Sequence, residues 1–202
     1  EASGTTISDS SGNGFTGVFN ASPNAPAWQT AANSKFGASS LGFDGTNDGL
    51  SVANINPWAG DFTIETWIKR NADSYHHIAS NEVYLTNGFR FGVKPTWKLV
   101  FWASESGGSG SVNTADNSIP QNAWTHVAAT RTGTTVTLYI NGQQAAQGTV
   151  TIVTPTAGLD VGGGCCGGPY NGLMDELRIS NIARSPEEIK QDAQRFPYSV
   201  YT

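Results

Sequence analysis

Three oxygen-bearing side chains occur at alternate positions near the start of the chain. Asp9, Ser11 and Asn13 are followed by Gly14, an order similar to the first half of a calcium-binding loop. The twelfth position, which is glutamate in an EF-hand, is Asn20, so the loop is not an EF-hand. Two interpretations stay open: a calcium site that other parts of the chain complete, or an Asx-type turn whose side chains cap backbone amides.

A further carboxylate lies in the apolar segment from Leu173 to Ile179. Strand periodicity places Asp175 on the same face as Leu173, Leu177 and Ile179, and so predicts that it points inward. A buried charge without a partner is too costly to keep. Asp175 is therefore expected to meet a cation, an arginine or several backbone amides.

The two cysteines of the chain, Cys165 and Cys166, are adjacent and lie in the glycine-rich segment Gly162 to Pro169. Neighbouring Cα atoms are about 3.8 Å apart, below the usual disulfide range of roughly 4.4 to 6.8 Å. A bond between them requires a distorted or cis peptide, which the flanking glycines could absorb. We predict this vicinal disulfide, a rigid apolar ring on an exposed loop; the alternatives are free thiols or bridges to another chain. Because a Cys-x-x-Cys motif is missing, redox catalysis is not expected.

The disulfide ring is expected to form a sugar-binding surface together with aromatic and polar residues, because sugar-binding sites combine an exposed aromatic face with a few polar groups. The expected ligand-binding residues are Cys165, Cys166, Tyr170, Trp102, His76 and Arg90. Among the tryptophans, Trp58, Trp97 and Trp102 are the candidates for an exposed face, with ordinary core packing as the alternative for each.

The adjacent histidines His76 and His77 would point to opposite faces of a strand, so one of them is expected to face outward. Two such side chains cannot readily hold one metal ion, and no third His or Cys lies nearby in the sequence, which disfavours zinc. His126 shares a face with Trp124 and is expected to be a core histidine.

Alternating apolar and polar residues predict strands through most of the chain. In Phe62 to Lys69 the pattern predicts a half-buried strand, with Phe62, Ile64 and Ile68 inward and Glu65, Trp67 and Lys69 outward. Gly88 to Lys94 repeats it, with Arg90 and Lys94 outward. Asn141-Gly142 predicts a type I′ hairpin turn between residues 134–140 and 143–147. Further strands are expected at residues 39–43, 49–52, 76–80, 97–102, 123–131, 159–162 and 173–179.

One helix is predicted, beginning after Ser185 as N-cap, with Pro186 at its first position and carboxylates in its first turn. A single short helix after so many strands predicts an all-β fold, an antiparallel β-sandwich with one short C-terminal helix. We expect residues 1–202 to form a single domain, in which residues 195–202 are a linker or a docked tail.

The composition excludes several classes of protein. The 202 residues carry 11 Lys and Arg against 16 Asp and Glu, a net charge of −5, so neither nucleic acid nor an anionic membrane surface is an expected partner. No apolar run approaches the roughly 20 residues of a bilayer helix, and membrane insertion is not expected. Because the outward cations such as Arg90 and Lys94 are scattered along an acidic chain, the expected ligand is neutral or weakly polar.

Six motifs in order make the chain similar to a known family, the laminin G-like, concanavalin A-like domains of bacterial extracellular proteins. They are Asp9 to Gly14, Phe36-Gly37 through Gly45, Phe62 to Trp67, Trp124 to Ala128, Leu138 to Gly142 and Met174 to Ile179. The resemblance implies a jelly roll of two curved sheets that often carries calcium, and it places calcium where the Asp175 strand meets the N-terminal loop. It thereby makes Asp9, Asn13 and Asp175 the expected ligands of a structural Ca²⁺. In such domains a first strand normally precedes the segment at residues 1–4, so a fragment, or another segment filling that place, is expected.

The resemblance also implies a function: a non-catalytic, lectin-like carbohydrate-binding module of a larger secreted or cell-surface protein, whose partners are a glycan or polysaccharide and the other domains of that chain. A protein–protein adhesion or spacer domain without a glycan ligand is the alternative. Glycoside hydrolases and lyases also use the fold. Hydrolases need two carboxylates across the scissile bond, whereas Glu65 is isolated and Asp175 and Glu176 point to opposite faces of a strand, so no catalytic residues are expected.

Overall fold

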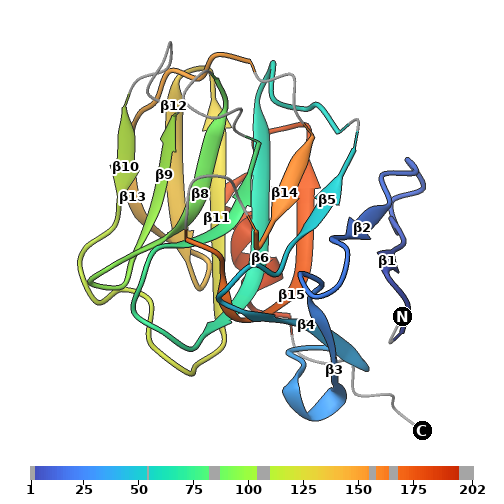
Figure 1. Ribbon diagram of the computed structural model, residues 1–202. Coiled ribbons are helices and arrows are strands. Elements are labelled where there is room, and N and C mark those ends of the chain that lie inside the picture. Colours follow the sequence, from blue (N-terminus) through green and yellow to red (C-terminus); the bar gives the residue numbers. More distant parts are fainter. Residues whose placement is uncertain are drawn as a thin grey trace, which may run out of the picture.

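The computed structural model describes residues 3–53, 55–81, 87–103, 110–154, 158–163 and 168–195. Two antiparallel sheets pack face to face (Figure 1). Sheet A has eight strands in the order β1 (Thr6–Ile7), β2 (Gly17–Phe19), β5 (Leu50–Val52), β14 (Leu159–Val161), β7 (His76–Ser80), β8 (Phe89–Lys94), β9 (Lys98–Ala103) and β10 (Ser111–Asn113). Sheet B has seven, in the order β13 (Gln143–Thr149), β12 (Thr135–Ile140), β11 (Thr125–Thr132), β6 (Phe62–Arg70), β15 (Asn171–Ser180), β4 (Ser39–Asp44) and β3 (Ala27–Thr30).

The predicted all-β, jelly-roll sandwich is confirmed. Every strand predicted from alternation is present within a few residues. The strands that were not predicted, β1, β2, β3 and β10, are two to four residues long. A short 3-10 helix, η1 (Ala31–Asn33), follows β3. The predicted turn is confirmed by the positive φ angles of Asn141 (49°) and Gly142 (77°).

The core fills the space between the sheets. Its centre is an aromatic stack in which the Phe89 ring lies 5.4 Å from that of Phe62 and 4.9 Å from that of Phe101, with the fully buried Trp58 against both Phe62 and Phe89. These phenylalanines come from β6, β8 and β9. The residues predicted to be inward therefore point toward the opposite sheet, and the residues between them on each strand face outward.

The single helix of the described residues, α1 (Pro186–Ala193), lies on the outer face of sheet B (Figure 1). Its predicted start is confirmed: the Ser185 hydroxyl accepts from the Glu188 amide, and the Glu188 carboxylate accepts from the Ser185 amide. Ile189 packs on Ala128 and Tyr139 of the sheet. The helix is eight residues long, and no helix in the described part of the chain is long and apolar enough to cross a membrane.

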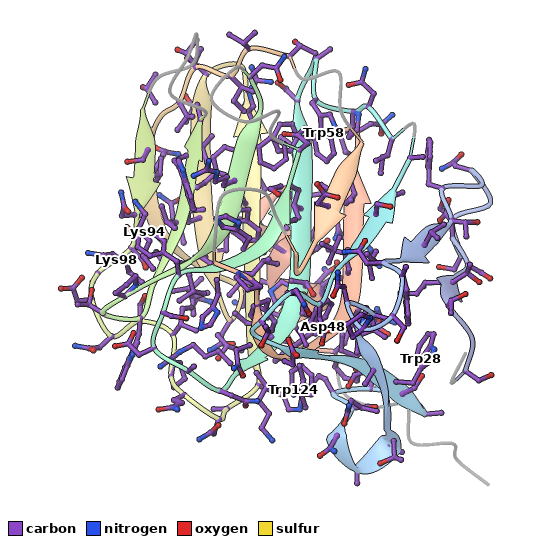
Figure 2. The ribbon with its side chains drawn as sticks, in the orientation of Figure 1. Trp28, Asp48, Trp58, Lys94, Lys98 and Trp124 are labelled. Atoms are coloured by element: carbon purple, nitrogen blue, oxygen red, sulfur yellow. The ribbon has the colours of Figure 1, made fainter. Side chains whose placement is uncertain are left out.

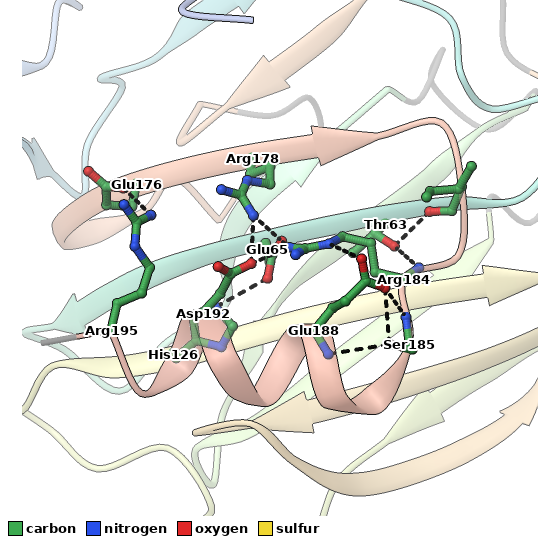
Figure 3. Close-up of polar contacts among 11 residues, drawn as sticks. Thr63, Glu65, His126, Glu176, Arg178, Arg184, Ser185, Glu188, Asp192 and Arg195 are labelled. Carbon is green, nitrogen blue, oxygen red and sulfur yellow. Dashed lines mark hydrogen bonds and ion pairs between the residues drawn. The ribbon is translucent and has the colours of Figure 1, made fainter.

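One prediction about β6 is wrong. The strand is buried on both faces: Glu65 and Trp67, on its outer face, are 2% and 6% exposed. The Glu65 carboxylate is covered by Arg184, which also bonds to Asp192 of α1 (Figure 3), while Trp67 is covered by Phe36, whose ring is 5.8 Å away. The strand was predicted to be half-buried, but its outer face is covered as well, because Arg184, which follows Glu65 by 119 residues, lies over it.

Candidate functional site

A row of side chains crosses the outer face of sheet A. Paired positions on neighbouring strands place Asp160 opposite Ser80, Ser80 opposite Arg90, Arg90 opposite Trp102 and Trp102 opposite Ser111. We call these five residues, from β14, β7, β8, β9 and β10, the Trp102 row. Strands spaced about 4.8 Å apart extend it over roughly 19 Å. The row thus offers one aromatic ring among hydroxyl, cationic and carboxylate groups.

The Trp102 indole lies over a glycine of the neighbouring strand. The centroid of its ring lies 5.5 Å from Arg90 Cζ and 5.0 Å from Lys94 Nζ, and these two residues flank Gly92. The same ring lies 5.7 Å from the ring of His77, the residue that pairs with Gly92 on β7. A Cβ on Gly92 would lie 2.2 Å from the His76 carbonyl oxygen. Only glycine therefore fits this position, because a side chain would collide with the backbone of β7.

Positive charge gathers at one side of the row. Lys94 and Lys98 pair directly across β8 and β9, and they lie next to one another in Figure 2. Lys98 Nζ is 2.8 Å from Asp116 Oδ1, in an exposed ion pair, whereas Lys94 Nζ lies 5.9 Å from the ring centroid of the exposed Tyr75. Burial, followed by the charges of Lys98 and Arg90, lowers the pKa of Lys94 from its ordinary value.

Two of the predicted ligand-binding residues, Trp102 and Arg90, face this surface together, and two others do not. Tyr170 is fully buried, packs edge-on against Phe43, and donates from its hydroxyl to the Leu173 carbonyl at 3.3 Å. Burial raises the pKa of Tyr170 well above its usual range. The prediction that Tyr170 forms part of an exposed surface is therefore wrong, because the residue after the glycine-rich loop returns to the core.

His76 also faces the interior. It is 1% exposed, its Nδ1 lies 3.1 Å from the Pro169 carbonyl oxygen, and its ring packs at 5.6 Å against Tyr170. The reason is register: His76 pairs with the inward Val93, whereas its neighbour His77 pairs with the outward Gly92. Of the two neighbouring histidines, His77 lies beside Trp102. The prediction that His76 belongs to the exposed ligand-binding surface is therefore wrong.

The other candidate tryptophans are part of the packing. Trp58 is in the core, and Trp97 stacks on the buried Arg70, whose Cζ lies 4.5 Å from the ring centroid. The Arg70 Nε donates to the Ile119 carbonyl at 2.8 Å, which holds the guanidinium in place. The alternative of ordinary packing is thus correct for both tryptophans.

Cys165 and Cys166 lie outside the described residues, so the vicinal disulfide stays a prediction. The described residues on either side show where the loop is anchored. The Gly162 amide donates to the Ile78 carbonyl at 3.1 Å, and the Gly168 carbonyl accepts from the His77 amide at 2.8 Å. Both anchors are on β7, beside the histidine that contacts Trp102.

The N-terminal oxygen residues form the Asx-type turn. Asp9 accepts from the amides of Ser11 (2.8 Å) and Phe15 (3.0 Å), and the Ser11 hydroxyl accepts from the amide of Asn13 (3.3 Å). These hydrogen bonds, above all those from Ser11, lower the pKa of Asp9. The carboxylate oxygens expected to hold Ca²⁺ are thus already used as acceptors for backbone amides.

Asp175 faces outward, which corrects the prediction that it points inward. A bulge between Asp175 and Arg178, with Glu176 at φ 53°, adds a residue to β15 and reverses the alternation. Asp175 pairs with the outward Trp67, and its carboxylate accepts from the amides of Lys35 (2.9 Å), Phe36 (3.0 Å) and Glu176 (2.9 Å). Of the three partners expected for this carboxylate, the structure shows several amides.

The calcium site that the resemblance implied would draw on carboxylates that already have protein partners. Asp9 and Asp175 each serve backbone amides, and no group of three or more His, Cys, Asp or Glu side chains that could hold a metal ion occurs among the residues that the structure describes. Calcium binding stays a prediction for solution measurements.

Comparisons with known proteins agree with this architecture. Among solved structures, the fourth domain of AbnA, an extracellular arabinanase from Geobacillus stearothermophilus in complex with arabinotriose, superimposes with a TM-score of 0.72, 21% identity and 93% of both chains covered. The binding domain of Paraclostridial Mosquitocidal Protein 1 gives a TM-score of 0.70 at 16% identity, over 95% of this chain and 50% of that one. The Ruminococcus gnavus IT-sialidase CBM40 bound to α2,3 sialyllactose gives 0.57 at 12% identity, over 66% and 83%.

These identities are low, so the three structures establish the fold alone. No curated protein sequence matches the chain. A family model does match, over residues 44–190, and these residues include β6, the Trp102 row and the start of α1. On this match, the chain belongs to the concanavalin A-like lectin/glucanases superfamily.

Proposed function

We propose that the protein is a non-catalytic carbohydrate-binding module that holds an oligosaccharide along the Trp102 row. The observation that carries the proposal is the row itself. A half-buried indole on β9 lies among polar residues contributed by four other strands, and the length of the row suits several linked sugars better than one. The sugar C–H face would pack on Trp102, and hydroxyls would bond to the exposed Ser111 and Asp160 of the row.

The comparisons support this reading. AbnA domain 4 is described in complex with arabinotriose and the sialidase CBM40 with α2,3 sialyllactose, and AbnA is an extracellular enzyme. We therefore propose a secreted or cell-surface location within a larger chain. A structural role for Ca²⁺ remains part of the proposal only if chelation lowers stability, since the carboxylates named for it already have amide partners.

The placement of carboxylates supports a binding role over hydrolysis. Glycoside hydrolysis needs two carboxyl groups flanking one bond, about 5 Å apart in retaining enzymes and roughly 6.5–9.5 Å apart in inverting ones. The Trp102 row contributes a single carboxylate, Asp160. Glu65 is on the other sheet, buried against Arg184 beneath α1.

A glycan array followed by titration calorimetry tests the proposal. The parent should bind at least one oligosaccharide, and Trp102→Ala should weaken that binding at least about tenfold, equivalent to roughly 1.4 kcal/mol. Trp124→Ala is the matched control, because Trp124 is also partly exposed but precedes β11 of the opposite sheet. Binding that both variants lose equally, or no glycan bound at all, would leave the adhesion role as the better explanation.

A further inference from the structure

Two cations lie close to the aromatic ring of the Trp102 row, and a third lies opposite one of them, in a protein whose net charge is negative. Arg90 and Lys94 both lie within 6 Å of the Trp102 ring centroid, at 5.5 and 5.0 Å, and Lys98 is directly opposite Lys94. They belong to two adjacent strands, β8 and β9. The hairpin formed by β8 and β9 therefore presents three cations at the place where a sugar would stack.

The fold gains little from the direct pairing of Lys94 with Lys98. Like charges directly opposite one another on a sheet are destabilising, and the charges that lower the pKa of Lys94, after burial, are both positive. Lys98 has Asp116 as an exposed partner, which contributes little. Lys94 contacts the rings of Tyr75 and Trp102, and in the described part of the chain no carboxylate forms an ion pair with it. An anion beside Lys94 would relieve this repulsion.

We propose that the ligand of the Trp102 row is an anionic glycan, with a carboxylate or sulfate group placed between Arg90 and Lys94 while the sugar ring packs on Trp102. This inference rests on the proposed function and names its substrate class. It replaces the expectation of a neutral ligand, which came from the net charge of the whole chain and not from the charge at this face. Guanidinium and ammonium groups are both suited to such oxygens, Arg through its planar fork and Lys as a point charge.

Matched polymers that differ in charge provide the test. Polygalacturonate and its methyl ester form the carboxylate arm, and dextran sulfate and dextran form the sulfate arm. In affinity electrophoresis or calorimetry, the parent should bind the charged member of at least one pair at least about tenfold more tightly than the neutral member. Raising the salt concentration from about 50 mM to about 500 mM should weaken that binding, because exposed charges are screened.

Variants separate a specific site from general attraction. Lys94→Met and Arg90→Gln should each lower binding of the charged polymer about tenfold and leave the folded state intact in thermal melts. Lys190→Gln removes the same charge from the exposed surface of α1 on the opposite sheet, and it should change binding less than twofold. A loss as large with Lys190→Gln as with Lys94→Met would overturn the inference, since it indicates net charge alone.

The remaining outcomes distinguish this inference from the proposed function. If the neutral polymer binds as tightly as the charged one and Trp102→Ala abolishes both, the carbohydrate-binding function stands and the anionic ligand is wrong. If the charged polymer binds and the three variants Trp102→Ala, Arg90→Gln and Lys94→Met all retain it, both are wrong, because the ligand then lies elsewhere on the protein.

Discussion

Arg184 donates a hydrogen bond from Nη1 to Oε1 of Glu65, a buried carboxylate that precedes it by 119 residues (Figure 3). The same Nη1 contacts Oδ2 of Asp192 in α1. Arg178 of β15 adds an Nη1 that is 3.6 Å from Glu65 Oε1, and His126 Nε2 is 3.4 Å from Oε2. One carboxylate therefore ties the helix, the last strand and the centre of sheet B together.

Replacing Glu65 should destabilise the fold strongly. Glu65→Ala removes the most deeply buried carboxylate partner of Arg184 and leaves Asp192 on the same Nη1, and breaking a buried ion pair costs about 3 kcal/mol. Urea denaturation should show this loss in the free energy of unfolding, while ligand binding at sheet A stays unchanged below the transition. The control is Glu176→Ala, which breaks the exposed pair with Arg195 (3.3 Å) and should cost no more than about 1 kcal/mol. Equal losses in the two variants would show that the buried pair contributes no more to the free energy of unfolding than the exposed pair does.

Asp175 should stabilise the fold without a metal ion. Asp175→Ala leaves the amides of Lys35, Phe36 and Glu176 without their acceptor, which should cost about 2 kcal/mol; Asp175→Asn, which keeps one acceptor oxygen, should cost less. The melting temperatures of the parent in EDTA and in millimolar Ca²⁺ test the calcium site in the same assay. A chelator-induced drop in the parent that Asp175→Ala abolishes would restore the calcium site, because binding to the folded state alone raises stability.

The vicinal disulfide can be read from the intact mass. Without reductant, the monomer should lack the mass of two hydrogen atoms and resist alkylation until it is reduced. The Cys165→Ala/Cys166→Ala double variant should unfold within about 1 kcal/mol of the parent, since the closed loop is the shortest possible and constrains little of the unfolded chain. We also expect it to bind the glycan more weakly, because the loop is anchored on β7 next to His77. Alkylation of both thiols in the untreated monomer would exclude the bridge.

The stability contributed by Lys94 should depend on pH. Burial and two cations lower its pKa in the folded state from the ordinary 10.5, so between the lowered value and 10.5 the unfolded chain binds more protons than the folded one. The free energy of unfolding of the parent should therefore rise with pH in this window, relative to Lys94→Met measured in parallel. Groups that titrate in both proteins cancel in the difference. A difference that stays flat or falls toward pH 10 would show that the lysine is not repelled in the folded protein.

Sequence periodicity was sufficient to predict the layers of this fold. Phe89, Phe91 and Val93 alternate with Arg90 and Lys94, and the structure buries the first three and leaves the other two on the outer face. The Ser185 cap and the Asn141-Gly142 turn were equally readable, because each depends on residues adjacent in the chain. Local rules of this kind hold wherever a strand keeps its period of two.

The candidate site depended on information that alternation does not carry. Whether His76 or His77 faces outward is decided by the pairing of β7 with β8, and whether Asp175 points inward is decided by one extra residue in β15. The neighbours of Trp102 are likewise set by register across strands that are distant in the sequence. A glycine at position 92, opposite both His77 and Val100, was the one available signal that a large ring could lie across the strands.

The Trp102 row and α1 occupy opposite outer faces of the sandwich (Figure 1). Arg195, the last described residue, follows α1 and is fastened to Glu176 of sheet B. A biotin attached to the exposed side of α1, for example at Lys190, would therefore be tethered on the side away from the row. When the protein is immobilised in this way on a sensor chip or a bead, sheet A should face the solution, so binding to the row can be measured without the support covering it.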